Sequence, residues 1–218
     1  MRLNPIVIAA ALGGVLAATA VTAQGSGTKR VRITYQNLTS GQVFSPSVFT
    51  AHTAGAPKLF APGTKASFGL AQLAEGGNVA PIAGMAGMMK GKADGNSTIG
   101  LPTMPGKTGV VVLDIDRAHP MVSGGWMLSM TNDGFTGISG VDAYDLRGPQ
   151  TMNVMAWDAG SEKNNERRPY LVALMGTKPD PEGGVVKRHT GIRGGADAPA
   201  AWKFDPGKPV ARVTITPM

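Results

Sequence analysis

Acidic residues follow two predicted strands, and of all the side chains in the sequence they are the best placed for chemistry. Residues 131–135 read TNDGF after one strand candidate, and residues 157–162 read WDAGSE after another, with Asp142 and Asp145 between them. Loops at strand ends can meet at one edge of an antiparallel sandwich, where carboxylates and carbonyls suit a hard cation such as Ca²⁺. Asp and Gly are also ordinary turn formers, so spacing alone leaves a solvated turn open.

Histidines offer a second chemistry. His52, His119 and His189 lie far apart in the sequence, and catalytic partners can be scattered in this way. A hydrolase or redox enzyme that uses His52 and His189 with nearby acids is therefore one alternative. The sequence has no phosphate-binding loop, no G-x-S-x-G elbow and no H-E-x-x-H motif. It has no cysteine, which excludes disulfides, thiolate zinc sites and cysteine nucleophiles.

The N-terminus has the layout of a secretory signal peptide. Arg2 precedes an apolar stretch, and small residues end at Ala23. We therefore expect a signal peptide over residues 1–23, a flexible leader over 24–29, one domain over 30–218, and export to the periplasm or the medium. The net charge of +7 becomes +6 without Arg2. This excess favours anionic surfaces such as lipid headgroups or polysaccharide, whereas export argues against nucleic acid.

The rest of the chain predicts a mostly β domain. Apolar and polar residues alternate with the period of a half-buried strand in several segments, and Gly and Pro are frequent between them. Strands are expected at 30–36, 42–50, 109–115, 126–130, 152–156, 170–175 and 210–216, with 109–115 apolar enough to be central. Residues 69–90 have helical spacing and predict a short helical excursion. This arrangement favours an antiparallel sandwich.

Several of these segments together resemble the spondin N-terminal domain family of bacterial proteins. The resemblance rests on residues 31–46 at the start, on 69–76, on the S-M-T-N-D-G-F and W-D-A-G-S-E segments, and on 189–192 and 210–215 at the end. It covers nearly all of the chain after the signal peptide. One motif alone is weak, but the five occur in the family's order.

This resemblance implies an antiparallel eight-stranded β-sandwich similar to calcium-dependent lipid-binding domains. Relatives in animals carry the domain in matrix adhesion proteins and place calcium on an aspartate after the central strand and on two acids of a D-A-G-T-D segment. Carried over, the ligands are Asp133, Asp158 and Glu162. The resemblance therefore implies a binding or adhesion-type module with a Ca²⁺ cofactor, and no enzyme.

Two departures from the animal pattern affect this expectation. Gly134 stands where an aromatic residue follows the first aspartate, and the third ligand is Glu162 instead of an aspartate. The disulfides and accompanying modules of the animal proteins are absent, so matrix adhesion in that sense does not carry over. A metal-free structural protein of the cell envelope, whose acidic loops are only turns, is the other alternative.

Overall fold

The computed structural model describes residues 27–88, 95–195 and 197–218. The strands are β1 (Lys29–Asn37), β2 (Ser47–His52), β3 (Ser97–Gly100), β4 (Thr108–Ile115), β5 (Met121–Met127), β6 (Gly134–Asp142), β7 (Gln150–Val154), β8 (Trp157–Asp158), β9 (Lys187–Arg188) and β10 (Ala211–Pro217). The helices are α1 (Phe68–Gly76) and α2 (Ala80–Met88), with 3-10 turns η1 (Arg168–Tyr170), η2 (Val172–Leu174) and η3 (Ala200–Trp202).

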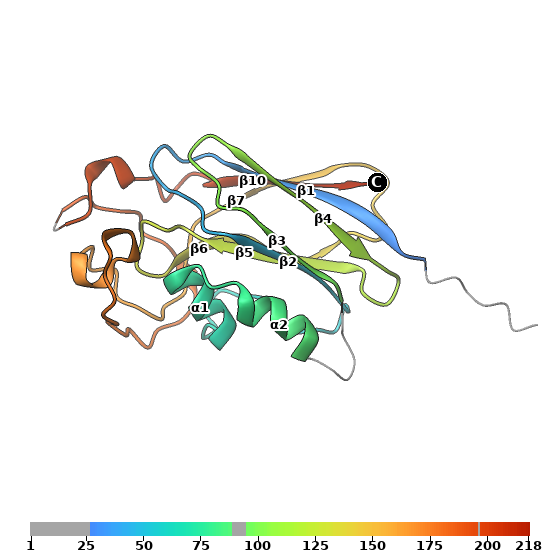
Figure 1. Ribbon diagram of the computed structural model, residues 1–218, viewed down its shortest axis with the longest axis horizontal. Helices are drawn as coiled ribbons and strands as arrows, with labels where there is room; N and C mark the ends of the chain where they lie inside the picture. Colours follow the sequence, from blue (N-terminus) through green and yellow to red (C-terminus); the bar gives the residue numbers. More distant parts are fainter. Residues whose placement is uncertain (1–26, 89–94, 196) are drawn as a thin grey trace, which may run out of the picture.

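Two antiparallel sheets face each other (Figure 1). One has the strand order β4-β1-β10-β7 and the other the order β3-β2-β5-β6-β8-β9. The prediction of a mostly β antiparallel sandwich is confirmed. The expected number of eight strands is wrong, since the described residues form ten. Two of these, β8 and β9, are two-residue strands that extend the sheet beside the acidic loops.

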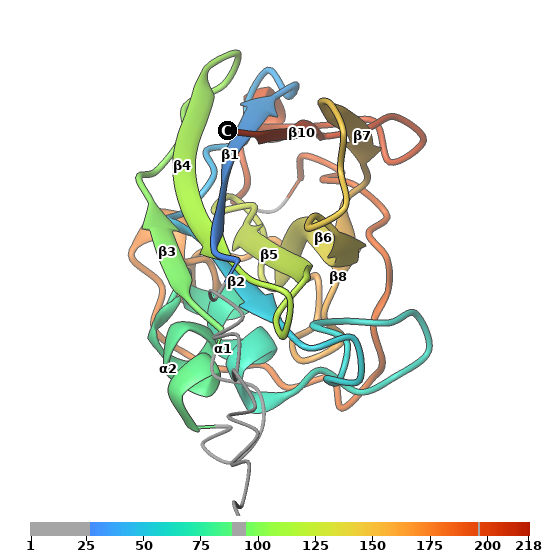
Figure 2. The same cartoon turned by 90° about the vertical axis from the view of Figure 1, so that its right-hand side faces the viewer.

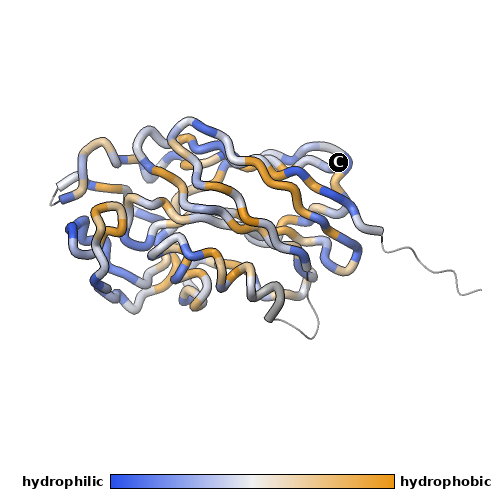
Figure 3. The backbone as a smooth tube through the Cα atoms, viewed as in Figure 1, coloured by the Kyte–Doolittle hydropathy of each residue, from blue (hydrophilic) through white to orange (hydrophobic). Residues whose placement is uncertain are grey.

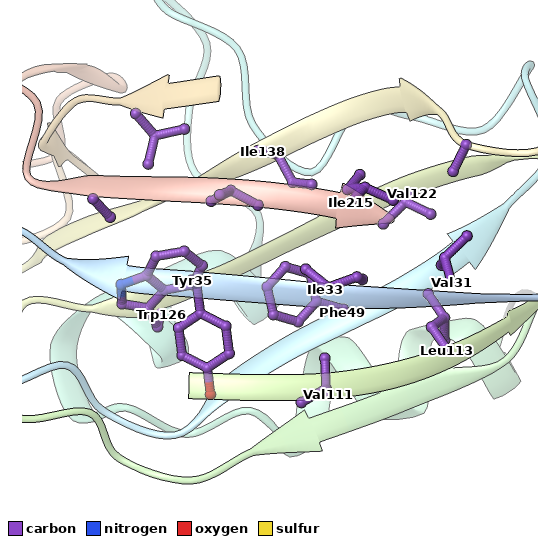
Figure 4. Packing of buried hydrophobic residues seen from close by; sticks show 14 of the residues in the cluster. Val31, Ile33, Tyr35, Phe49, Val111, Leu113, Val122, Trp126, Ile138 and Ile215 are labelled. Atoms are coloured by element: carbon purple, nitrogen blue, oxygen red, sulfur yellow. The ribbon is translucent and has the colours of Figure 1, made fainter. Parts of the chain in front are cut away.

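The core between the sheets comes from the alternation seen in the sequence. Val31, Ile33 and Tyr35 of β1 are buried while the residues between them face outward. Hydrophobic and hydrophilic residues alternate along these strands in Figure 3. In Figure 4 the Trp126 and Tyr35 rings lie together, 5.0 Å between centroids, and Phe49 lies 5.9 Å from Trp126. These aromatic side chains fill the space between the sheets. Truncating one such buried ring to alanine is expected to lower the free energy of unfolding by about 3–5 kcal/mol.

A second apolar layer lies on the other face of the six-stranded sheet. Leu70 and Leu73 of α1 pack there against Val48 and Phe135. Helix α1 starts where the Ser67 hydroxyl accepts the Leu70 N–H, and it ends at Gly77, whose φ of 66° is the left-handed conformation that glycine adopts at low cost. The predicted helical excursion is thus present as two short helices beneath this sheet (Figure 1).

The strand predictions need several corrections. The strand expected at 126–130 overlaps β5 only at residues 126–127, since β5 spans residues 121–127 and the chain turns after Leu128. Residues 109–115 form β4, which is an edge strand and not a central one. Residues 170–175 form 3-10 turns, because Pro169 and the turn at Met175 (φ 63°) break an extended run. The sequence analysis did not predict β3, β6 or β9; the glycines and small polar residues of β6 give no apolar alternation, and β9 has only two residues.

The predicted signal peptide and the first residues of the leader, 24–26, lie outside the described residues. Within the described residues, no helix has the length and apolarity that a bilayer crossing requires.

Candidate metal centre

The two acidic loops meet because their strands are neighbours. Strand β8 pairs with the start of β6, with Asp158 opposite Gly134 and Trp157 opposite Phe135. Figure 2 shows β6 and β8 side by side in the lower sheet. Asp133 immediately precedes β6 and Asp158 ends β8, so strand pairing alone brings the two carboxylates to the same edge. The prediction that these loops share one edge is therefore confirmed.

Asp133 connects the two loops by hydrogen bonds. Its Oδ2 accepts the N–H of Ser161 at 2.8 Å, the N–H of Glu162 at 2.9 Å and the Ser161 hydroxyl at 3.2 Å. Its own carbonyl accepts the Ala159 N–H at 3.1 Å. The side chain is fully buried, yet Oδ1 has no hydrogen-bond partner. A buried carboxylate oxygen without a partner is costly, which makes Oδ1 the most unusual atom of this region.

Asp158 is also fully buried, and both of its oxygens are engaged. Oδ1 accepts the Gly160 N–H at 2.7 Å, and Oδ2 accepts the Asn164 side-chain amide at 2.6 Å. The Lys187 ammonium lies 3.7 Å from Oδ2 and also binds Glu182. Gly160 has φ 69°, and a Cβ there would lie 2.5 Å from the Val185 backbone. Only glycine therefore allows the chain to curl tightly after Asp158.

Glu162 lies next to these two acids and is also buried. Its backbone forms a bridge with Pro181, and the neighbouring Lys163 N–H donates to the Asp180 carbonyl at 2.9 Å. Residues 180–184 thus run alongside the 160–163 turn, with Glu182 N–H bonded to the Ser161 carbonyl at 3.0 Å. This segment holds the Glu162 backbone in place, and the backbone of Asp180 also acts on the Glu162 carboxylate by a hydrogen bond that lowers its pKa against the larger effect of burial.

Burial changes the protonation of all three acids. It raises the pKa of Asp133 to about 7, with the Asp158 charge adding to the effect. It raises the pKa of Glu162 to about 7, with the charge of Glu75 adding to it. The pKa of Asp158 is also raised by burial, against the opposing hydrogen bond from Gly160. The carboxylates are thus placed where their charged forms are unfavourable without a compensating cation.

The carboxylates do not form a closed ligand cluster. Among the described residues no three His, Asp or Glu side chains converge in a geometry that could hold a metal ion. The chemistry of the donors nevertheless suits a hard cation, because all are carboxylate oxygens and Asp133 Oδ1 is free. Asp133 would supply that oxygen, and Asp158 and Glu162 the remaining charges.

Two side chains lie near this site that the sequence analysis did not assign to it, although it named His189 as a candidate catalytic residue. The His189 ring lies beside Gly134, where an added Cβ would be 3.0 Å from Cδ2 of the imidazole and 2.4 Å from the Thr131 hydroxyl. This crowding is the physical reason why glycine follows Asp133. Glu75, at the end of α1, acts on the Glu162 charge. Both lie far from the acidic loops in sequence, so local spacing could not predict that they would be neighbours of these loops in the fold.

His189 itself is a buried neutral side chain. Its Nδ1 accepts the Gly191 N–H at 2.9 Å, which leaves the ring proton on Nε2, an atom without a partner. Burial lowers the pKa of His189 to about 4. The ring packs on Phe204 with 5.3 Å between centroids. These contacts place His189 in the packed interior of the protein.

His52 and Asp142 lie at the opposite end of the same sheet. His52 pairs with Met121, and Met121 pairs with Asp142 at the far end of β6 from Gly134. The nine residues of β6 make eight steps of extended strand, which separate its two ends by about 27 Å. His52 bonds to the Ser123 hydroxyl at 2.8 Å and to the Thr53 carbonyl at 2.9 Å. His52 and His189 therefore do not face a common site, and Asp142 is remote from Asp133.

In comparisons with known proteins, no protein-family model matches the chain, and no curated protein matches it.

Proposed function

We propose that this chain is an exported, spondin-like binding module that holds one Ca²⁺ at the sandwich edge through Asp133, Asp158 and Glu162. The observation that carries the proposal is the Asp133 carboxylate, fully buried with Oδ1 free, beside two further buried acids. Three buried carboxylates with raised pKa values store an unfavourable charge that a divalent cation would neutralise. Calcium accepts such irregular oxygen sets more readily than smaller cations.

The residues around the acids also set a limit on affinity. Asn164 and Lys187 already engage Asp158 Oδ2, so both compete with any cation for that oxygen. The expected affinity is therefore that of an extracellular module, with a Kd of about 0.1–1 mM. The bound ion would tie together the two loops that Asp133 now connects by hydrogen bonds alone.

Anionic surfaces are the proposed partners. The chain carries 21 basic against 14 acidic residues, a balance that favours lipid headgroups or polysaccharide. Export to the periplasm or the medium, through the signal peptide expected at residues 1–23, would place the protein beside such surfaces. An intact mass that begins at Gln24, measured on protein secreted by its host, tests this part of the proposal. A mass that retains residues 1–23 contradicts it.

Thermal unfolding tests the metal site. The chain, as the host processes it, is melted in chelator and in about 1 mM Ca²⁺, a concentration in the working range of extracellular modules. The wild type is expected to melt several degrees higher with calcium, whereas Asp133→Asn should show no shift. Asp145→Asn, which changes an exposed acid, is the matched control and should respond as the wild type does. No shift in the wild type contradicts the site.

A metal-free structural protein of the envelope is the second candidate. The observation in its favour is that the Asp133 Oδ2 bonds already connect the loops and that no closed ligand cluster exists among the described residues. In that case Asp133→Ala lowers the melting temperature equally with and without calcium. A hydrolase or redox enzyme built on His52 and His189 together would need side chains that the sheet holds at opposite ends.

A further inference from the structure

The turn that contains η1 and η2 ends in an exposed apolar tip. Met175 is 89% exposed and Val172 is 47% exposed. The Met175 N–H donates to the Val172 carbonyl at 3.0 Å, so both residues belong to the same tight turn. In Figure 1 the orange segment that holds these residues lies at one end of the long axis of the molecule. Apolar side chains that gather at the end of a molecule indicate a contact with something outside the chain.

Cations lie at both ends of this turn, and no acid lies between them. Residues 167–178 read RRPYLVALMGTK. The side chains of Arg167, Arg168 and Lys178 are exposed, and within the described residues none of them forms an ion pair. The turn therefore presents an apolar middle between positively charged ends.

The two acids beside the turn are already bonded to other groups. Asp180 accepts a hydrogen bond from Lys163 Nζ at 2.9 Å. This bond is the main cause that lowers the pKa of Asp180, and the charge of Arg167 adds to it. Asp197 Oδ2 accepts the backbone N–H of Arg168 at 2.8 Å, a bond that does not involve the guanidinium group. The positive charge of the turn is therefore available to a ligand.

Hydrogen bonds within the turn hold its backbone in place. Besides the bond between Met175 and Val172, the Gly176 N–H donates to the Leu171 carbonyl at 2.9 Å. The Leu171 side chain beneath them is fully buried in a small apolar cluster. Backbone groups that are bonded in this way need no water, which lowers the cost of moving the tip into an apolar medium.

We propose that residues 167–178 are the contact of this protein with an anionic lipid bilayer, with Val172 and Met175 in the headgroup region and the three cations beside the lipid phosphates. A bilayer is negatively charged at its surface and apolar beneath it, which matches the cations and the apolar tip of this turn. The inference rests on the anionic surface proposed above as the partner, and it names that surface and the residues that meet it.

A bilayer fits this tip better than a protein or a polysaccharide. A stable protein interface buries about 800 Å² on each partner, whereas the tip offers two exposed apolar side chains at the end of the molecule. A polysaccharide would meet the cations but would leave Met175 in water. Exposure alone does not make such a surface, since Leu101 is 83% exposed in a segment, residues 97–106, that carries no charged side chain.

Co-sedimentation with vesicles of equal parts phosphatidylglycerol and phosphatidylcholine tests the apolar tip. Met175→Asn removes the apolar side chain, and asparagine tolerates the φ of 63° at this position. The variant is expected to bind about fivefold more weakly, because part of one apolar side chain no longer leaves water. Leu101→Asn is the matched control and should bind as the wild type does. Equal binding by Met175→Asn and the wild type overturns the proposal.

The same assay tests the cations. Arg167→Gln combined with Arg168→Gln is expected to weaken binding about 30-fold at low salt, the effect of two arginines beside an anionic membrane. Arg32→Gln combined with Arg212→Gln removes the same charge from exposed positions on β1 and β10, and it should weaken binding far less. Equal losses in the two double variants would mean that total charge is recognised, and they overturn the proposal.

Both comparisons are made in chelator and in about 1 mM Ca²⁺. The tip and its cations need no metal, so the differences between the variants are expected in both media. A wild type that binds the vesicles in neither medium overturns this inference. The calcium-dependent melting shift tests the metal site separately, so the two failures are distinguishable.

A fluorescent probe tests whether the tip enters the bilayer. The chain has no cysteine of its own, so an environment-sensitive dye can be attached to Met175→Cys alone. Its emission is expected to move to shorter wavelength when the anionic vesicles are added, whereas the same dye on Leu101→Cys should not respond. The same response at both positions, or no response at Met175→Cys, overturns the proposed contact.

Discussion

The carboxylate of Asp133 accepts the backbone N–H of Glu162 at 2.9 Å across 29 residues of sequence. One proposed ligand thus fixes the backbone of another. This hydrogen bond uses Oδ2 and leaves Oδ1 without a partner. The same side chain therefore both connects the two loops and carries the buried oxygen that has no hydrogen bond. Changes to Asp133 therefore act on two properties, loop position and charge, which the first prediction separates.

Asp133→Asn is expected to stabilise the metal-free protein at about pH 8 or leave it unchanged, while Asp133→Ala destabilises it by about 1–3 kcal/mol. The amide oxygen can still accept the Ser161 and Glu162 N–H groups, and it removes a buried charge. Alanine leaves both donors without a partner. Chemical denaturation in chelator measures the difference. If both variants lose the same free energy of unfolding, the charge of Asp133 stabilises the fold even without metal.

Acidification is expected to stabilise the metal-free protein between about pH 8 and pH 5. The pKa of Asp133 and that of Glu162 are each about 7 in the fold, against 3.8 and 4.5 as ordinary values, so the folded chain binds protons that the unfolded chain releases. Stability is therefore highest at low pH in this window and falls as the pH rises through 7. His189 opposes this trend below about pH 6.5, since its pKa falls to about 4, but it offsets only one of the two carboxyls.

Melting temperatures in chelator across this pH range check the prediction. Asp133→Asn should flatten the slope, and calcium should reverse it, because the metal competes with protons for the same oxygens. A wild-type protein whose melting temperature rises steadily from about pH 5 to pH 8 in chelator would contradict the raised pKa values.

Lys187→Gln is expected to tighten calcium binding about threefold, the scale of a partly exposed ion pair. The ammonium lies 3.7 Å from Asp158 Oδ2 and is a tethered cation beside a proposed ligand. Lys208→Gln is the matched control, since Lys208 lies 3.6 Å from Asp205 in an exposed pair. Calcium titration followed by calorimetry measures both. Weaker binding in Lys187→Gln than in the control would mean that Lys187 supports the site instead of competing for it.

Gly160→Ala is expected to destabilise the fold far more than Gly63→Ala. Both glycines have positive φ, 69° and 80°, so each substitution carries the strain of a left-handed residue, about 1 kcal/mol. At Gly63 a Cβ meets nothing within 4 Å, but at Gly160 it would lie 2.5 Å from the Val185 backbone. Denaturation midpoints compare the two. Similar losses would show that the 158–162 turn can move away from residues 184–185.

Binding to anionic vesicles is expected to exceed binding to neutral vesicles and to fall with salt. The basic excess of the chain is the physical reason, since exposed charges are screened within about 8–10 Å at physiological ionic strength. Co-sedimentation with and without calcium measures both effects. If binding is the same on neutral lipid and on anionic lipid, charge is not the recognition element, and polysaccharides become the surfaces to examine.

Local pattern determined the sandwich and the positions of several strands. Val31, Ile33 and Tyr35 alternate because one face of a strand is buried and the other is wet, and this rule acts within a few residues. The strands β1, β4, β7 and β10 and the helix α1 were predictable for that reason. The two acidic loops were also predictable from local sequence, because Asp and Gly are frequent in the turns that follow strands.

Tertiary structure alone decided which segments became neighbours. The apolar run of β4 predicts a central strand, yet sheet order put it at an edge, because strand order depends on long-range pairing that no short window contains. Pairing of β6 with β8 brought Asp133 to Asp158 and packed His189 against Gly134, 55 residues away in sequence. The raised pKa values follow from this burial, since desolvation depends on what surrounds a carboxylate in space and not on its neighbours in the chain.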